Sequence, residues 1–552
     1  MKLGGTTVRP IEAREWRWVA VVAGSLLAMA AFPYVLALVH PPDGWLLTRT
    51  LYYGEDLSQY LAAMGDGASS PSWLVQDHLT AEPHSAAFMY PYYVFLGKTA
   101  ALLGLQLPLV FAFSVALAPV ALVFAGYSFA AAFVEPTWGR RGALLVLLFS
   151  SCLGIWIVAV VGPDMLPSET ASGLFAFNRA ELATFLLPFG PPHLTLALAL
   201  LMLWGRSLAC FAWNGGRGSM ALLAASVLGV GFLNPFTLVP MAALAAGYAL
   251  VRWMASARFP MNEALAALLT AAVAAPFLAV SFASFGLDPF WSAVYGRQNT
   301  TGSPALWGLA IQLGVILPLA MAGALYPRMR RDARLLLSFW VLLLLVLMSL
   351  PVPFQRRFGF GLLPAASVLA AQGIVWGVNA LRGHRGPRLA FLTAVGTLAF
   401  GGTMLSYVAF ALAGLGVGGL GQSVFEPRST VEATDWLATH SDRADVVISS
   451  FETGNYLAGR IPGRVVAGHW VATLDARRKD GMLRDFFGPA ATVSERLRMV
   501  EEQRVTFLFI GRRERSLGME APSGEDGFRW VYGNDEVSIY RLERSLAKLP
   551  VP

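Results

Sequence analysis

Long apolar runs separated by short polar segments fill the first three quarters of the chain. Many of these runs approach or exceed the roughly 20 residues that a helix needs to cross the hydrocarbon of a bilayer. They lie at about 18–39, 106–133, 141–161, 192–213, 219–233, 235–253, 261–285, 305–326, 334–350, 358–380 and 388–416. The pattern predicts an α-helical polytopic membrane protein with about eleven transmembrane helices.

The pattern changes near residue 425, where alternating and amphipathic segments replace the long apolar runs. Apolar stretches at 445–450, 463–470 and 505–511 are typical of buried strands, and 429–441 and 494–503 are typical of surface helices. The segment 529–542 predicts a hairpin with its turn at Gly533–Asn534–Asp535. We therefore expect two domains, a transmembrane domain at 1–424 and a small soluble α/β domain at 425–552.

Composition and charge distribution agree with a membrane protein. Only 14% of the residues are charged and 56% are apolar, whereas about 25% charged is usual in soluble domains. The net charge of +7 comes from arginines grouped between apolar runs, as in cytoplasmic loops, and does not indicate a nucleic-acid partner. This grouping predicts a cytoplasmic N-terminus and an extracytoplasmic C-terminal domain. No GxGxxG, P-loop, CxxC or HExxH motif is present in the C-terminal part.

The break FLNPF at 232–236 separates two apolar runs, because proline cannot continue a helix smoothly. We expect two short helices that meet near the outer face. The alternative is a kink within one tilted span.

An adjacent pair of acids, Glu55 and Asp56, lies in a long predicted outer loop at 40–105. A carboxylate that is partly shielded from water can serve as a general base. The alternative is that the pair caps the helix expected at 56–64 and faces water.

Other polar residues are predicted on the same side of the membrane. Arg356 and Arg357 are candidates for binding a phosphate, since the guanidinium group matches phosphate with a planar fork. Candidates for acceptor binding in the second outer loop and beyond are Asp164, Glu169, Glu181, His193, Glu452, Asn455 and His469. His78, Glu82 and His84 are candidate ligands of a divalent metal ion such as Mg, Mn or Zn, although solvated loop residues are an alternative.

Four stretches together resemble the GT-C superfamily of polyprenyl-phosphate-sugar-dependent transferases, which includes protein O-mannosyltransferases, the aminoarabinose transferase of lipid A and the catalytic subunit of oligosaccharyltransferase. GEDLSQYLA at 54–62 is similar to the acidic motif after the first span, with the order of the two acids reversed. RRFGFGLLPAASVLAA at 356–371 is similar to the Arg-Tyr-x-Leu-Pro-Ala stretch, with Phe358 in place of tyrosine. FLNPF stands where relatives have a Lys-Gly-Pro break, without the lysine, and the stretch at 449–470 resembles tails of bacterial transferase-like membrane proteins.

The resemblance implies an inverting glycosyltransferase in a bacterial cytoplasmic membrane. It would move a sugar from a polyprenyl-phosphate-linked donor to a glycan, lipid or protein acceptor on the outer face. Glu55 or Asp56 would act as the base, and Arg356 or Arg357 would bind the donor phosphate. Two alternatives stay open: a transporter or flippase for a lipid or polyol, and an inactive scaffold that binds a polyprenyl lipid during envelope assembly.

Overall fold

The computed structural model describes residues 10–161, 181–417, 424–522 and 527–543. The chain divides into two compact units, each built from three separate segments. Unit 1 comprises Met1–Phe32, Ser114–Val280 and Thr301–Ala411, and unit 2 comprises Pro33–Phe113, Ser281–Thr300 and Leu412–Pro552. The predicted domain boundary at residue 425 stays a prediction, because the two units are defined by contacts between segments and not by the position of the segments in a membrane.

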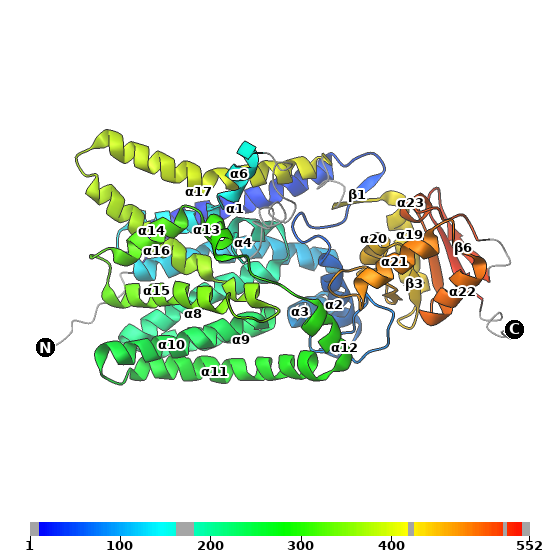
Figure 1. Ribbon diagram of the computed structural model, residues 1–552, viewed down its shortest axis with the longest axis horizontal. Helices are drawn as coiled ribbons and strands as arrows, with labels where there is room; N and C mark the ends of the chain where they lie inside the picture. Colours follow the sequence, from blue (N-terminus) through cyan, green and yellow to red (C-terminus); the bar gives the residue numbers. More distant parts are fainter. Residues whose placement is uncertain (1–9, 162–180, 418–423, 523–526, 544–552) are drawn as a thin grey trace. The chain divides into compact units, whose positions relative to one another are not determined.

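Unit 1 is helical (Figure 1). Its helices lie wholly or mainly within its three segments: α1 (Ala13–Val39), α4 (Leu107–Phe133), α5 (Thr137–Phe149), α6 (Gly154–Val161), α8 (Pro192–Asn214), α9 (Arg217–Leu233), α10 (Leu238–Ser256), α11 (Met261–Phe282), α13 (Leu306–Leu313), α14 (Ile316–Leu325), α15 (Arg331–Leu347), α16 (Leu362–Ala380) and α17 (Arg385–Gly414). Short 3-10 turns occupy Thr184–Phe189, Pro235–Thr237 and Gln355–Gly359.

Within the described residues, seven helices are long and apolar enough to cross a membrane, or up to eight if the bent pair α13 and α14 forms one span. The sequence predicted about eleven spans. The difference arises because several apolar runs form shorter helices: α5 has 13 residues, and α9 and α15 have 17 each. The polytopic, mainly helical class itself is confirmed.

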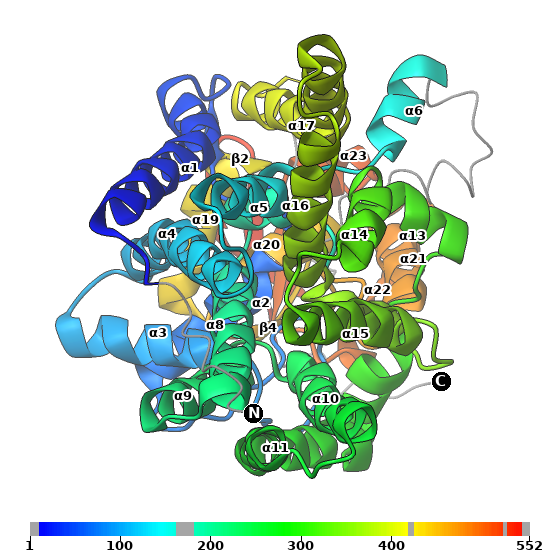
Figure 2. The same ribbon diagram turned by 90° about the vertical axis from the view of Figure 1, so that its left-hand side faces the viewer.

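Helix α16 forms the centre of unit 1, and every residue from Leu362 to Gly373 is buried. Figure 2 looks along several helices of this unit, with α5, α14 and α15 around α16. Gly323 of α14 and Gly373 of α16 allow the two backbones to touch: a Cβ at Gly323 would lie 1.8 Å from the Leu369 carbonyl oxygen. Small residues at such a crossing are the usual means of close helix packing in membranes.

The predicted break at 232–236 is present. Helix α9 ends at Leu233, Asn234 leaves the helical conformation, and α10 begins at Leu238 after the turn Pro235–Thr237. The two helices are therefore separate elements and not one kinked span.

Unit 2 contains a five-stranded mixed sheet in the order β4-β3-β5-β7-β6. Strands β3, β4 and β5 are parallel, and β7 pairs antiparallel with β5 and β6. The predicted hairpin is confirmed, because Gly533 of β6 pairs with Ser538 of β7. The strands are β1 (Trp45–Leu47), β2 (Phe425–Pro427), β3 (Val446–Ile448), β4 (Arg464–Val465), β5 (Phe507–Ile510), β6 (Phe528–Gly533) and β7 (Ser538–Leu542).

Helices cover both faces of this sheet. Leu437 of α19 packs on one face, and Phe486 of α21 and Val500 of α22 pack on the other. The helices of unit 2 are α2 (Leu57–Ser69), α3 (Pro91–Leu103), α12 (Pro289–Trp291), α19 (Arg428–His440), α20 (Phe451–Ala458), α21 (Ala476–Phe487), α22 (Val493–Glu502) and α23 (Arg512–Ser516), with wider π-type turns at Ala283–Leu287 and Ser292–Gln298.

The first loop contributes directly to the core of the sheet. Leu79 is buried in the cluster on one face and Ala81 in the cluster on the other. The backbone N–H of Val465 in β4 donates to the His78 carbonyl at 2.9 Å. Strand β1 of the same loop pairs antiparallel with β2. The loop and the C-terminal segments thus fold as one body, which fixes the acidic pair against the sheet domain.

Candidate active site

The acidic pair lies in unit 2, immediately before helix α2. Asp56 occupies the N-cap position, but its side chain makes no capping hydrogen bond to the helix. Glu55 is exposed, whereas the Asp56 side chain has 30% of its surface accessible. The two neighbouring acids therefore have different surroundings.

His469 of the C-terminal segment holds the Asp56 carboxylate. Nε2 of His469 lies 2.9 Å from Oδ1 of Asp56. The backbone N–H groups of Val471 and Ala472 donate to Nδ1 of His469 at 3.2 and 3.1 Å. With Nδ1 as an acceptor, the proton of the neutral imidazole is on Nε2, which then donates to Asp56 and does not accept from the Gln59 amide nitrogen 3.0 Å away. His469 is only 5% exposed, so its orientation is fixed by packing as well as by these bonds.

Asn455 of α20 fixes the backbone of the acidic pair. Its side-chain amide donates to the carbonyl oxygen of Glu55 at 3.0 Å, and its own oxygen accepts from the Ser58 hydroxyl at 3.4 Å. Asn455 is 3% exposed. Two predicted acceptor-site residues, Asn455 and His469, therefore contact the acidic pair. A third, Glu452, is exposed in the first turn of the same helix.

Three residues near this cluster were not predicted. The side-chain amide nitrogen of Gln59 lies 3.0 Å from Nε2 of His469, and its oxygen accepts from the hydroxyls of Tyr90 and Tyr295. Gln59 follows Asp56 by three residues at the start of a helix, a spacing that places both on one face. The sequence thus carried a signal for Gln59, whereas Tyr295 comes from a distant segment and carried none.

The two candidate phosphate-binding arginines lie in unit 1, in the short helix Gln355–Gly359 that precedes α16. Nε of Arg356 lies 3.4 Å from Oε1 of Glu181, and both side chains are largely buried, at 15% and 11% exposed. The guanidinium of Arg357 lies over the ring of Phe236, 4.5 Å from its centroid. Phe236 belongs to the helix break at 232–236. Three segments that the sequence predicted separately therefore meet within unit 1: the second outer loop with Glu181, the arginine stretch and the helix break.

The remaining candidates are less informative. His193 is half-buried and occupies the second position of α8. Asp164 and Glu169 lie outside the described residues.

The predicted metal ligands do not form a common site. The two ring nitrogens of His84 bind backbone groups at 2.8 Å, and Nε2 of His78 lies 3.3 Å from Oδ2 of Asp66. The Glu82 carboxylate accepts from Nζ of Lys479 at 2.7 Å. In the part of the chain that the structure describes, no group of three or more His, Cys, Asp or Glu side chains is placed to hold a metal ion. The structure therefore does not group His78, Glu82 and His84 around one ion, and in it their side chains contact protein groups instead.

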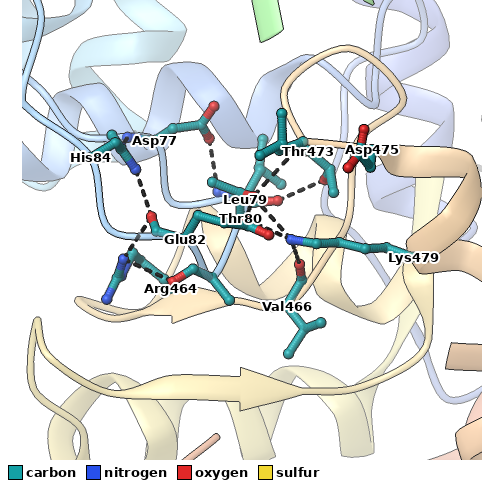
Figure 3. A network of polar contacts seen from close by, with 12 residues as sticks. Asp77, Leu79, Thr80, Glu82, His84, Arg464, Val466, Thr473, Asp475 and Lys479 are labelled. Carbon is teal, nitrogen blue, oxygen red and sulfur yellow. Dashed lines mark hydrogen bonds and ion pairs between the residues drawn. The ribbon is translucent and has the colours of Figure 1, made fainter. Parts of the chain in front are cut away.

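Figure 3 shows how these contacts tie the first loop to the C-terminal segments. Nζ of Lys479, a fully buried side chain, also donates to the Val466 carbonyl at 3.0 Å. Burial raises the pKa of Glu82, but the Lys479 ammonium group outweighs this effect and the net pKa is lowered. Burial lowers the pKa of Lys479, and the neighbouring Glu82 carboxylate opposes this shift. The contact between the two side chains anchors the loop.

Comparisons with known proteins identify the architecture. No protein-family model matches the sequence, and no curated protein matches it. Among solved structures, the archaeal oligosaccharyltransferase AglB from Archaeoglobus fulgidus, in complex with an inhibitory peptide and a dolichol-phosphate, is similar with a TM-score of 0.54 at 13% identity, over 98% of this chain and 76% of its own. ArnT from Cupriavidus metallidurans bound to undecaprenyl phosphate is similar with a TM-score of 0.52 at 12% identity, over 98% of this chain and 100% of its own.

This chain shares its fold with these two proteins. The GT-C-like architecture predicted from the short sequence motifs is therefore confirmed as a fold. At 12–13% identity the likeness concerns the fold alone, and the roles of individual residues must be argued from their own surroundings.

Proposed function

We propose that this protein is an inverting glycosyltransferase of the bacterial cytoplasmic membrane, using a polyprenyl-phosphate-linked sugar donor and an acceptor on the outer face. The single observation that carries the proposal is the pair of Asp56 and His469, with Oδ1 and Nε2 2.9 Å apart. A carboxylate oriented by a buried histidine and still partly exposed has the properties of a general base. The fold adds support, because AglB and ArnT were solved with dolichol-phosphate and undecaprenyl phosphate.

In the proposed reaction, Asp56 accepts the proton of an acceptor hydroxyl or amide. The acceptor atom forms a bond to the anomeric carbon as the bond from that carbon to the phosphate oxygen breaks. The phosphate leaves with the electron pair, and one displacement inverts the configuration. His469 is a positioning residue: its N–H occupies Oδ1, which directs the other carboxylate oxygen to the acceptor.

Asp56→Asn tests the base. The amide oxygen can still accept the His469 hydrogen bond, but the amide cannot accept a proton, so we expect turnover to fall by about two to four orders of magnitude. The assay uses protein in nanodiscs with a panel of undecaprenyl-phosphate monosaccharides and bacterial membrane extract as the acceptor source, and follows release of undecaprenyl phosphate. Glu55→Gln is the matched control and should retain turnover. Wild-type turnover in Asp56→Asn would show that Asp56 is not the base.

We further propose that Arg356 binds the donor phosphate and that Arg357 stabilises the helix break through its contact with the Phe236 ring. Arg356→Gln should weaken binding of undecaprenyl phosphate, measured by native mass spectrometry, about tenfold or more, because a charge-assisted hydrogen bond contributes about 1.5–3 kcal/mol. Glu181→Gln should strengthen binding, since it removes the carboxylate that pairs with Arg356. The exposed Arg258→Gln is the control and should bind as wild type. Equal affinities in all variants would remove Arg356 from the donor site.

A divalent metal requirement is tested in the same assay. Adding a chelator and then restoring Mg, Mn or Zn separates metal-dependent from metal-independent turnover. His78, Glu82 and His84 are not proposed as its ligands, because the described residues place no three His, Cys, Asp or Glu side chains around one ion.

A further inference from the structure

Unit 2 contains a small pocket beside the acidic cluster, bounded by α2, the loop before α3 and the segment around α12. Its volume is about 10 Å3, which is room for about one group the size of a water molecule or an ammonium group. The lining residues that matter here are Gln59, Asp77, His78, Tyr90, Trp291 and Tyr295. None of them belongs to the residues proposed above for catalysis or phosphate binding.

Two lining residues present buried acceptor atoms without partners. Oδ1 of Asp77 accepts from the Leu79 N–H at 2.9 Å, but in the described part of the chain Oδ2 has no hydrogen-bond partner. Figure 3 shows the hydrogen bond from Leu79 to this carboxylate. Nε2 of His78 lies 3.3 Å from Oδ2 of Asp66, and its buried Nδ1 likewise lacks a partner among the described residues. In the tautomer that donates from Nε2 to Asp66, Nδ1 is an acceptor. Asp77 and His78 are each 7% exposed.

The donors around the pocket are already engaged elsewhere. The hydroxyls of Tyr90 and Tyr295 donate to Oε1 of Gln59, the latter at 3.0 Å. Nε1 of Trp291 donates to the Ser85 carbonyl at 2.9 Å. The lining therefore offers acceptor atoms and three aromatic rings to a ligand.

Such a lining selects a particular kind of ligand. A buried carboxylate oxygen left without a donor is costly, so its ligand should carry N–H or O–H groups. Burial raises the pKa of Asp77 to about 6, so the carboxylate is ionised in neutral solution and favours a positive charge. Aromatic rings also attract cations through their π faces. A protonated primary amine combines three N–H donors with one positive charge.

We propose that this pocket binds a protonated primary amine, whose ammonium group donates to Asp77 and His78 and lies against the rings of Tyr90, Trp291 and Tyr295. The inference does not depend on glycosyl transfer. The exposed side chain of Gln76, another lining residue, marks the side on which the ligand enters.

The test titrates full-length protein in nanodiscs with methylammonium chloride in amine-free buffer and follows binding by calorimetry and by the thermal midpoint. We expect saturable binding and a rise of the midpoint. Tetramethylammonium chloride, which has no N–H donor, and sodium chloride at equal ionic strength should produce neither effect. If either matches methylammonium, the pocket is not an amine site.

Two variants locate the binding. Asp77→Asn should weaken methylammonium binding at least tenfold, whereas Asp442→Asn, which removes an exposed carboxylate from the same unit, should bind as wild type. Tyr295→Leu removes one of the aromatic rings and should also weaken methylammonium binding. If Asp77→Asn does not fold, Tyr295→Leu alone tests whether the amine binds in this pocket. Wild-type affinity in either pocket variant, or no binding to the wild type, would overturn the proposal and leave a pocket that holds water.

Discussion

At the scale of single residues, the two neighbouring acids Glu55 and Asp56 differ because only one of them meets a buried partner. His469 reaches Asp56 across 413 positions of the chain, and two backbone N–H groups determine which ring nitrogen carries the proton. The Asn455 side chain donates to the backbone carbonyl of Glu55, whose carboxylate is exposed. This difference explains why we assign the proposed base to Asp56 and use Glu55 as its control.

Asp77 gives a prediction for stability against pH. Burial raises its pKa from the ordinary 3.8 to about 6. Between these values the folded protein binds a proton that the unfolded chain has lost, so the free energy of unfolding decreases as the pH rises through this range. At about 1.4 kcal/mol per pKa unit, the loss amounts to roughly 3 kcal/mol.

Asp77→Asn should remove this dependence. We expect its thermal midpoint, measured in amine-free buffer, to exceed that of the wild type at pH 8 and to match it at pH 4. Asp442→Asn should follow the wild type at both pH values. If the variant and the wild type have equal thermal midpoints at pH 8, the ionised Asp77 carboxylate does not destabilise the folded state.

At the scale of elements, the short antiparallel pairing of β1 in the first loop with β2 in the C-terminal segment stabilises unit 2. Glu426 of β2 is 1% exposed, and its carboxylate accepts from Arg49 at 3.1 Å and from Arg513 at 2.8 and 3.1 Å. The two arginines come from the first loop and from α23. One buried carboxylate thus joins three elements that are distant in sequence.

Glu426→Gln should lower the stability of the protein markedly. It leaves two largely buried arginines without their counter-charge, and breaking a buried ion pair from one side commonly costs about 3–5 kcal/mol. The thermal midpoint and limited proteolysis of the 40–105 loop measure the effect. Glu432→Gln on the exposed face of α19 is the matched control and should change neither. A Glu426→Gln protein as stable as the control would mean that the strand pairing alone fastens the loop.

At the scale of the whole molecule, each compact unit draws on three separate stretches of the chain. The arrangement explains why the first loop, which the sequence places between two spans, shares a core with the sheet. Leu79 and Ala81 lie on its two faces. Removal of residues 425–552 would therefore expose apolar side chains of the first loop and release Asp56 from His469.

Membrane orientation is the prediction at this scale. The arginine-rich loops predict a cytoplasmic N-terminus and an extracytoplasmic C-terminal segment. Reporter fusions after Arg140 and after Phe425 should report opposite sides, the first cytoplasmic and the second extracytoplasmic. Reports from the same side would contradict the orientation and, with it, transfer on the outer face.

The sequence by itself determined the features that depend on local pattern. Apolar runs predicted the helices, because the length needed to cross hydrocarbon is a property of one segment. Asn234–Pro235 predicted the break between α9 and α10, and Gly533–Asn534–Asp535 predicted the turn of the β6–β7 hairpin, because proline and glycine restrict or permit backbone angles locally.

Only the tertiary structure decided which of these elements meet. His469 and Asp56, the Glu426 carboxylate and its two arginines, and the pocket of Asp77, His78 and Tyr295 each join residues far apart in the chain. The loop residues His78, Glu82 and His84 suggested a metal site by proximity, yet each binds a protein group that no local pattern identifies. The physical reason is that hydrogen bonds and burial depend on distances in space, which follow from the packing of the whole unit and not from the spacing of residues along the chain.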